Sequence, residues 1–351
     1  MPDPRSRLTV RKGWGAFSLL EVLVATSVLV IIMVVIFSMT QQISGAWRSS
    51  TAKIEAFQGG RGAFDAMSRQ IGLATLNTYY DYFDLTGKPR GALASGTFVP
   101  HHYGRYSDLH FITGKSLVTS PAAQVGHAIF FQAPLGYTDD IVNYGGMQTL
   151  LNACGYFVVY DKDNSRPKFL DDGVTIPKKP ADRYRFRLMQ FFQPDQRLAV
   201  YSSGATDWFT TPLASASPPV RIMAENVVAV ILLPKLSKVE ESTQGVLAKD
   251  YEYNTRPALL SGTQGKVDYQ LPPVVEVIMV AIDEPSAQRI CTTKTAPDLG
   301  LAALFQTLDP LDPQAQLEKD LDKLTATLRD RHITYRVFRS EVALRGAKWS
   351  S

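Results

Sequence analysis

Cysteine is scarce in this chain of 351 residues, which contains Cys154 and Cys291 alone. The two residues stand far apart and form no C-x-x-C pair, so the sequence carries no paired-cysteine metal or redox motif. If the body of the protein lies outside the cytoplasm, a disulfide bridge between Cys154 and Cys291 is one interpretation. Two separate buried thiols are the interpretation that we favour.

Excess charge is nearly absent from the body of the chain. Residues 1–16 hold four basic residues against Asp3, and the remaining 33 basic and 32 acidic residues almost cancel. A body without excess positive charge gives no electrostatic reason to expect nucleic acid as a partner. The function classes that depend on a basic surface are therefore disfavoured.

Motifs of the common enzyme classes are also missing. The sequence contains no Walker loop, no G-x-S-x-G and no H-E-x-x-H. Gly60-Arg61-Gly62 begins like a G-x-G-x-x-G fingerprint, but Asp65 stands at the last glycine position. We therefore predict that the protein is not an enzyme.

Residues that could hold a metal ion occur without a ligand pattern. His101, His102, His110 and His127 have no carboxylate or cysteine at ligand spacing, and we predict no metal site there. The stretch DKDNS (161–165) begins like a calcium loop, but its sixth and twelfth positions are Arg166 and Asp172. An ordinary turn is the simpler interpretation. We expect no cofactor, with calcium as the open alternative.

Long hydrophobic runs are confined to one place, FSLLEVLVATSVLVIIMVVIFSM (17–39). This run has about the 20 residues that a helix needs to cross a bilayer. The basic residues before it predict a cytoplasmic N-terminus and an exported body. A cleaved secretory signal fits poorly, because such signals have about 7–15 apolar residues and an A-x-A site. A plain signal anchor leaves Glu21 unexplained, since a central carboxylate costs about 2.5–3.5 kcal/mol.

The stretch FSLLEV (17–22), after its basic leader, resembles the prepilin cleavage and methylation signal of type IV pilins and type II secretion pseudopilins. The resemblance implies that a prepilin peptidase cuts between Ala16 and Phe17 and methylates the new amine of Phe17. Glu21 then becomes the fifth residue of the mature chain. The sequence departs from the family at Ala16, where a glycine is usual, and this departure bears on how efficiently the chain is cut.

Glu21 has a physical role in this interpretation. After cleavage the amine of Phe17 lies one helical turn from Glu21. In a filament of packed helices the carboxylate can pair with the amine of a neighbouring subunit, which relieves two charges that are costly in hydrocarbon. Glu21 would then set the axial register of assembly. The alternative is a chance glutamate near the interface of an ordinary membrane anchor.

The rest of the chain predicts an α+β protein with a long N-terminal helix packed on a β-rich globular head. Phe57, Gly60, Phe64, Met67, Ile71 and Ala74 recur at helical spacing, and this stripe predicts that the helix packs on the following domain. Leu317, Leu321, Leu324 and Leu328 predict a C-terminal amphipathic helix after Asp312-Pro313. Strands are predicted at 109–113, 127–132, 155–160, 184–191, 198–201, 226–233, 274–282, 331–338 and 341–344.

We therefore divide the chain into a leader (1–16), a transmembrane and assembly helix (17–39), an amphipathic continuation (40–76) and a periplasmic head (77–351). Within the head, Arg183, Arg185 and Arg187 alternate with apolar residues, which predicts three guanidinium groups on one solvated face of a strand. A pilus tip that captures DNA would use such a face. The nearly neutral head argues against that use.

Several stretches resemble particular families of pilin-like proteins. RGAFDAMSRQI (61–71) and the β-rich head look like the large J-type minor pseudopilins. The following stretches resemble the Verru_Chthon cassette protein C family: ATLNTYYDY (74–82), SDLHFITG (107–114), AIFFQAPLGY (128–137), LLNACGYFVVY (150–160), YRFRLMQ (184–190), ENVVAVILLPKLS (225–237), LPPVVEVIMVAIDE (271–284) and YRVFRSEVALRGAKW (335–349).

These resemblances imply a minor pseudopilin of the inner membrane, spanning it once and placed at the tip of a short type II secretion or type IV pilus-like filament. The implied partners are a prepilin peptidase, other pilin-like subunits, an inner-membrane assembly platform and membrane lipid. The alternative is a signal-anchored envelope protein whose head binds a ligand or DNA and does not polymerise. Glu21 distinguishes the two, because only the first needs its carboxylate.

Overall fold

The computed structural model describes residues 18–90, 98–120, 122–163, 182–201, 206–236, 246–256, 265, 267–309 and 311–349. The chain divides into two compact units, Met1–Ala52 and Lys53–Ser351, and each is described by itself. The boundary falls within the first helix, α1, which spans Leu19–Ile71.

The first unit contains the apolar part of α1. Leu19–Gly45 is a candidate membrane span of 27 residues by its length and composition, and none of it is buried. The helix begins beside Ser18, whose hydroxyl accepts a hydrogen bond from the backbone N–H of Glu21. A serine at this position satisfies a backbone donor that the helix itself leaves without a partner.

The second unit is a β-rich head with short helices. Its strands are β1 (Tyr79–Phe83), β2 (His102–Tyr106), β3 (Ile112–Lys115), β4 (Gln124–Pro134), β5 (Leu151–Lys162), β6 (Tyr184–Gln193), β7 (Val220–Glu225), β8 (Val227–Lys235), β9 (Tyr253–Asn254), β10 (Val274–Ile282) and β11 (Tyr335–Ala343). Its helices are α2 (Ile141–Tyr144), the short 3-10 helix η3 (Asp195–Arg197), α3 (Asp207–Leu213), α4 (Glu284–Ile290) and α5 (Pro313–Asp330). The predicted α+β class is confirmed.

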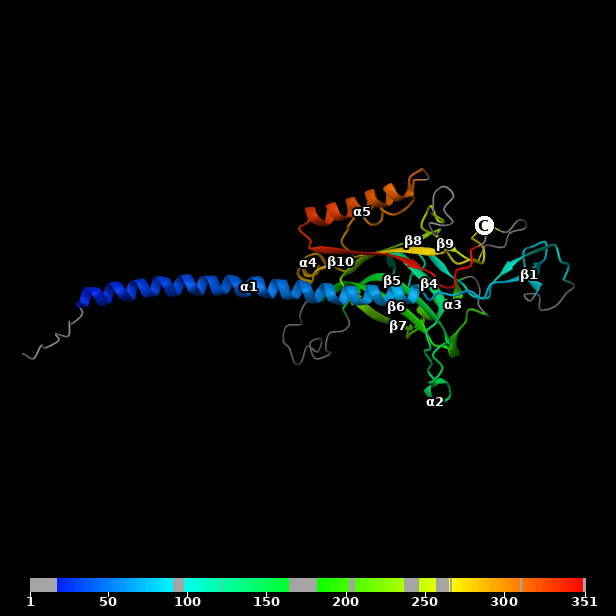
Figure 1. Ribbon diagram of the computed structural model, residues 1–351, viewed down its shortest axis with the longest axis horizontal. Helices are drawn as coiled ribbons and strands as arrows, with labels where there is room; N and C mark the ends of the chain where they lie inside the picture. Colours follow the sequence, from blue (N-terminus) through cyan, green and yellow to red (C-terminus); the bar gives the residue numbers. More distant parts are fainter. Residues whose placement is uncertain are drawn as a thin grey trace, which may run out of the picture. The chain divides into compact units, whose positions relative to one another are not determined.

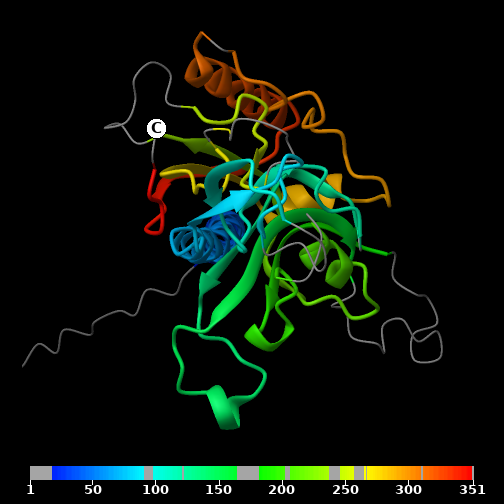
Figure 2. The ribbon, with the colours of Figure 1, turned by 90° about the vertical axis from the view of Figure 1, so that its right-hand side faces the viewer.

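Within the described residues the strands form three antiparallel sheets (Figure 1). The largest has the order β7-β6-β5-β4-β3-β9, the second has the order β11-β10-β8, and β1 pairs with β2 as a separate hairpin. The two larger sheets meet around one core, to which α1 adds Phe64, Met67 and Ile71. Another core lies on the other face of the six-stranded sheet and includes Trp208 and Phe209 of α3. Figure 2 shows the ribbon of the head from the side.

The predicted apolar stripe of α1 is buried in the head. Met67 and Ile71 have no exposed surface, whereas Arg61 and Arg69 on the opposite side are exposed. Gly60 lies where the helix is close to the sheet, since a Cβ atom there would meet Phe338 at 3.6 Å. The spacing of three and four residues thus identified the packed face correctly.

The C-terminal helix is confirmed as well. Asp312 caps α5 by accepting a hydrogen bond from the N–H of Ala315, and Leu317, Leu324 and Leu328 are buried beneath the helix. The two strands predicted at 331–338 and 341–344 are one continuous strand, β11.

The strand predicted at 198–201 is wrong. These residues follow η3 without joining a sheet, although Val200 is buried in the core under α3. The carbonyl of Val200 accepts a hydrogen bond from the side chain of Arg256 (2.9 Å) rather than from a strand. A side chain from a distant segment therefore satisfies this backbone group, and the apolar pattern alone could not reveal it.

Candidate functional site

The first candidate site is the N-terminal end of α1, where Ser18 and Glu21 bind each other reciprocally. The backbone N–H of Glu21 donates to the Ser18 hydroxyl (3.2 Å), and the N–H of Ser18 donates to Glu21 Oε2 (3.3 Å). This is a capping box, which satisfies two donors at the start of a helix. The S-x-x-E spacing was readable in the sequence, and our sequence analysis did not use it.

Glu21 lies in an otherwise apolar environment. Leu20, on one side of it, is 71% exposed, and Val22, on the other, is 51% exposed. Among the residues that the structure describes, no basic side chain forms an ion pair with Glu21. The predicted cleavage residues Ala16 and Phe17 lie outside the described residues.

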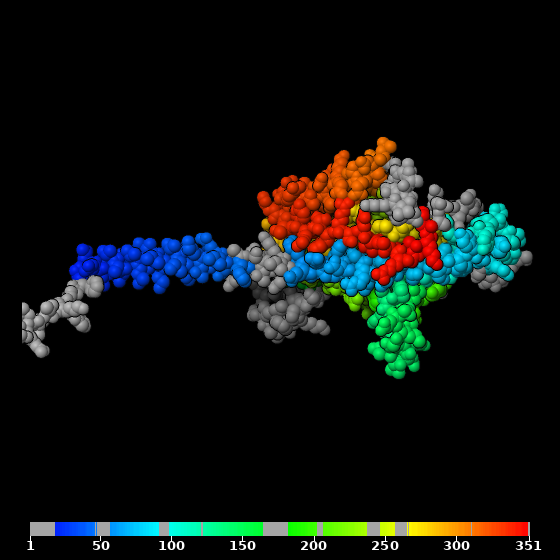
Figure 3. All heavy atoms as spheres, in the orientation of Figure 1, coloured from blue at the N-terminus to red at the C-terminus, as the bar shows by residue number. Residues whose placement is uncertain are grey.

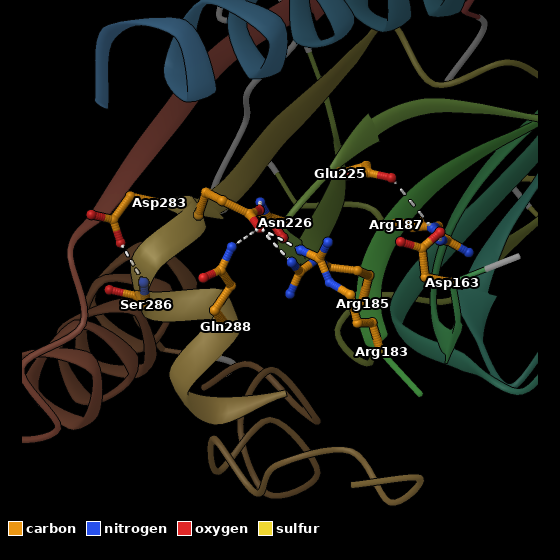
Figure 4. A network of polar contacts seen from close by, with 10 residues as sticks. Asp163, Arg183, Arg185, Arg187, Glu225, Asn226, Asp283, Ser286 and Gln288 are labelled. Carbon is orange, nitrogen blue, oxygen red and sulfur yellow. Dashed lines mark hydrogen bonds and ion pairs between the residues drawn. The ribbon is translucent and has the colours of Figure 1, made fainter. Parts of the chain in front are cut away.

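The three arginines predicted on one strand do not form a solvated face: Arg185 and Arg187 lie in β6, and Arg183 directly precedes it. The side chain of Arg185 is 2% exposed and that of Arg187 is 7% exposed. Arg185 pairs with Glu284, which also accepts hydrogen bonds from Arg183 (3.0 Å), Asn226 (2.8 Å) and Gln288 (2.8 Å) (Figure 4). The predicted solvation is wrong for Arg185 and Arg187, because acidic side chains from other segments pair with them inside the head. The side chain of Arg183 is 45% exposed.

Arg187 has its own acidic partners. It pairs with Asp163 (2.6 Å) and lies 3.8 Å from Glu225. Asp163 is the third residue of the stretch considered as a calcium loop, and Asn164, Ser165 and Asp172 of that stretch lie outside the described residues. These ion pairs occupy the guanidinium groups that a DNA-binding face would need.

The histidines lie in separate places. Trp208 Nε1 donates to His110 Nδ1 (3.0 Å), and His110 Nε2 lies 2.7 Å from Asn254 Oδ1. The N–H of Leu232 donates to His127 Nδ1 (3.1 Å), so the other ring nitrogen donates to the carbonyl of Phe305 (3.3 Å). Burial lowers the pKa of His127 from 6.5 to about 4, which keeps the ring neutral.

His101 and His102 do not join the other two histidines. His102 stacks on Phe83, with the ring centroids 5.0 Å apart, and His101 lies beside it. Across the described ranges, no three His, Cys, Asp or Glu side chains gather in a way that could hold a metal ion.

Both cysteines are free and buried in the structure. Cys154 lies in a polar cluster on β5, where Gln70 of α1 accepts hydrogen bonds from Tyr156 and from Gln190 (2.7 Å). Burial raises the pKa of both the Cys154 thiol and the Cys291 thiol to about 11. Neither thiol therefore has the thiolate character of a reactive cysteine.

A second candidate site lies on the β1–β2 hairpin, which the sequence analysis missed. Three tyrosines on one face of this hairpin are exposed: Tyr80 by 57%, Tyr82 by 50% and Tyr103 by 61%. A cavity of about 270 Å³ adjoins Tyr80 and is also lined by Arg105, Gln270 and Lys348 among others. The aromatic run YYDYF was the available signal, since aromatic residues favour strands.

Comparisons with known proteins found no family model, no curated protein and no solved structure that matches this chain.

Proposed function

We propose that the protein is a pilin-like minor subunit that a prepilin peptidase cuts between Ala16 and Phe17. In this proposal the mature chain begins at a methylated Phe17, spans the inner membrane once and exposes its head to the periplasm. It then joins other pilin-like subunits on an inner-membrane assembly platform. The filament would be of the type II secretion or type IV pilus kind.

The observation that carries the proposal is the carboxylate of Glu21 at the start of an apolar helix that nothing in the structure buries. An apolar surface around the whole helix needs lipid or neighbouring helices to cover it. A carboxylate in such surroundings is costly unless a cation compensates its charge. The amine of a processed neighbour would supply that cation and would fix the register between two subunits.

The capping box is compatible with this role. Ser18 becomes the second residue of the processed chain, so its N–H remains available to Glu21 Oε2 after cleavage. The contact holds the carboxylate at the helix terminus, where the helix dipole also favours negative charge. These two interactions would therefore stabilise the carboxylate of Glu21 at the membrane interface until the amine of a neighbouring subunit approaches.

The size of the head supports a place at the filament tip. The second unit comprises Lys53–Ser351, which is most of the chain. A subunit at the tip has no next layer above it, so a bulky head meets no steric limit there. The stripe of α1 that packs on this head supports the same general plan.

The N-terminus of the native protein tests the proposal directly. We expect mass spectrometry of protein from cells with an active prepilin peptidase to find a methylated Phe17 as the first residue. A chain that still begins at Met1 or Pro2 in those cells would contradict the proposal.

Assembly is tested by replacing Glu21. We expect Glu21→Val to abolish co-purification with partner subunits, because the pairing carboxylate is lost. Thr26→Val is the matched control, since it also removes a polar group from the same apolar span. The Thr26 hydroxyl donates a hydrogen bond to the carbonyl of Leu23 in the preceding turn. Partner subunits retained by both variants would show that Glu21 has no role in assembly.

A second candidate function is a signal-anchored envelope protein whose head binds a ligand without polymerising. The exposed tyrosines and the adjoining cavity of the β1–β2 hairpin favour this alternative. It predicts that Glu21→Val leaves membrane anchoring and ligand binding unchanged. DNA as the ligand is disfavoured, because Arg185 and Arg187 are buried in ion pairs.

A further inference from the structure

The tyrosine platform consists of Tyr80, Tyr82 and Tyr103 on the outward face of the β1–β2 hairpin. The strand register places Tyr82 opposite Tyr103 and Tyr80 opposite Arg105, so these side chains share one face. The ring centroids of Tyr80 and Tyr103 lie 5.5 Å apart, and those of Tyr82 and Tyr103 lie 5.0 Å apart. Figure 3 shows the hairpin, in cyan, at the surface of the head.

The opposite face of the hairpin holds it to the head. Phe83 is 3% exposed, and the ring of Tyr106 lies 5.2 Å from that of Tyr269. The inward side chains therefore anchor the hairpin to the head, whereas the outward tyrosines remain exposed. Three clustered aromatic side chains left in solvent are a common sign of a binding surface.

A cavity continues the platform. Tyr80 lines both, and the cavity wall adds hydrogen-bonding groups from Arg105, Gln270 and Lys348. Arg105 is held in place, since it donates to the carbonyl of Gly265 (3.1 Å). At about 270 Å³ the cavity is smaller than the sites that bury drug-sized ligands, and it suits one ring of a longer molecule.

We propose that the tyrosine platform and this cavity bind a neutral oligosaccharide. A sugar ring presents C–H bonds on its faces and hydroxyl groups around its edge. The faces fit the apolar surface of tyrosine rings, while the hydroxyl groups fit the polar side chains of the cavity. Tyrosine also offers a large rigid contact at a low cost in conformational entropy.

The local charge favours a neutral ligand over a polyanion. In the described parts of the hairpin segment, 79–90 and 98–108, Lys88, Arg90 and Arg105 are balanced by Asp81, Asp84 and Asp108. Lys348 of the cavity wall adds one positive charge. Binding to nucleic acid depends on several positive charges along the ligand's path. A surface with a single excess charge offers little of that attraction, and it imposes no penalty on an uncharged sugar chain.

The cavity also argues against a flat protein partner. Tyrosine and arginine are common in protein interfaces, but lysine is depleted there. Here the aromatic residues border a polar cavity that contains Arg105 and Lys348. A flat apolar partner would cover these groups without offering them hydrogen bonds, which costs free energy.

A glycan array tests this proposal with the full chain in lipid nanodiscs, because detergents with sugar headgroups would compete. The array carries neutral and acidic oligosaccharides, and single-stranded oligothymidylate serves as the polyanion probe. We expect retention on neutral glycans that does not depend on salt. Replacing Tyr80 or Tyr103 with alanine should weaken that retention about tenfold, equivalent to about 1.4 kcal/mol.

Two further variants test whether the effect is specific to the tyrosine platform and whether it depends on an aromatic ring. Tyr144→Ala removes an exposed tyrosine from α2, outside the platform, and should leave binding unchanged. Tyr80→Trp should restore binding, because indole offers a similar apolar face.

Retention on no neutral glycan, or an equal loss in Tyr144→Ala, would overturn the proposal. Retention on acidic glycans or oligothymidylate alone, lost at high salt, would assign the surface to polyanions instead. The inference does not rest on polymerisation, so its failure leaves cleavage at Phe17 and the role of Glu21 untouched.

Discussion

The two parts of α1 differ in how their apolar side chains are distributed around the helix and in whether these side chains are buried. In Leu19–Gly45 they point in all directions and none is buried, whereas from Phe64 to Ile71 they form one stripe that the head covers. A stripe requires a partner on one side of the helix, and an apolar surface all round requires apolar surroundings. One continuous helix therefore contains a candidate membrane span and a segment that packs on protein, and the pattern of apolar residues distinguishes the two.

The two parts of the chain also differ in how a carboxylate among apolar residues is compensated, as Glu276 and Glu21 show. Glu276 of β10 is 1% exposed, and Lys235 and Arg339 pair with it inside the head. Among the described residues, the Glu21 carboxylate accepts a hydrogen bond from Ser18 and forms no ion pair. The head thus supplies the counter-charges for its buried acid, whereas in the proposed assembly the counter-charge for Glu21 would come from a neighbouring subunit.

The largest expected effect comes from deleting a buried side chain of the stripe. Met67→Ala should destabilise the head by about 3 kcal/mol, because it removes buried apolar surface and leaves a cavity. Denaturant unfolding followed by tryptophan fluorescence measures this, since Trp208 is buried in the head. Met33→Ala, in the apolar part of α1, is the matched control and should not change the unfolding of the head. Equal effects of both variants would contradict the division of α1 into two environments.

Neutralising Glu276 tests how much its buried ion pairs contribute to the stability of the head. Glu276→Gln should cost about 3 kcal/mol of unfolding free energy, because Lys235 and Arg339 lose a buried counter-charge. Glu341→Gln is the control: its side chain is 57% exposed and 3.7 Å from Lys235, so a change of less than about 1 kcal/mol is expected. Similar losses in both variants would show that burial of Glu276 does not govern its contribution.

Acid should weaken the head through His127. Its pKa falls from 6.5 to about 4 on folding, so between these values only the unfolded state binds the proton. Stability is therefore complete above pH 6.5 and decreases as the pH falls toward 4, by about 2 kcal/mol between pH 7 and pH 5. Urea unfolding at several pH values measures this loss. In His127→Asn that part of the pH dependence should vanish, and its persistence would assign the effect to other groups.

Local patterns in the sequence predicted much of the fold. The stripe of α1 and the helix α5 were found because helical spacing and the Asp312-Pro313 start are properties of adjacent residues. The centres of β8 and β10 were found because their runs are rich in β-branched residues. The interrupted prediction for β11 failed where Arg339 stands in the strand, since its partner Glu276 is distant in the sequence.

The candidate sites were less predictable for the same reason. Glu21 was identified because it is the one charged residue within the apolar run 17–39. The burial of Arg185 depends on its pairing with Glu284, which lies about 100 residues further along the chain. No local pattern in the sequence predicts this pairing. The cavity beside Tyr80 joins residues near position 80 to Gln270 and Lys348, so only the folded chain creates it.

The smallest expected effect concerns how closely α1 approaches the head at Gly60. Gly60→Ala should stabilise the head by about 1 kcal/mol, because alanine favours the helix and its methyl group would meet Phe338 and Ala281 at ordinary contact distances of 3.6 and 3.8 Å. Gly60→Leu should instead destabilise it by about 1–3 kcal/mol through overpacking. At Gly62 nothing lies within 4 Å, so Gly62→Leu should be tolerated. Thermal unfolding of the variants distinguishes the two positions, and equal tolerance of leucine at both would show that α1 does not contact the sheet at Gly60.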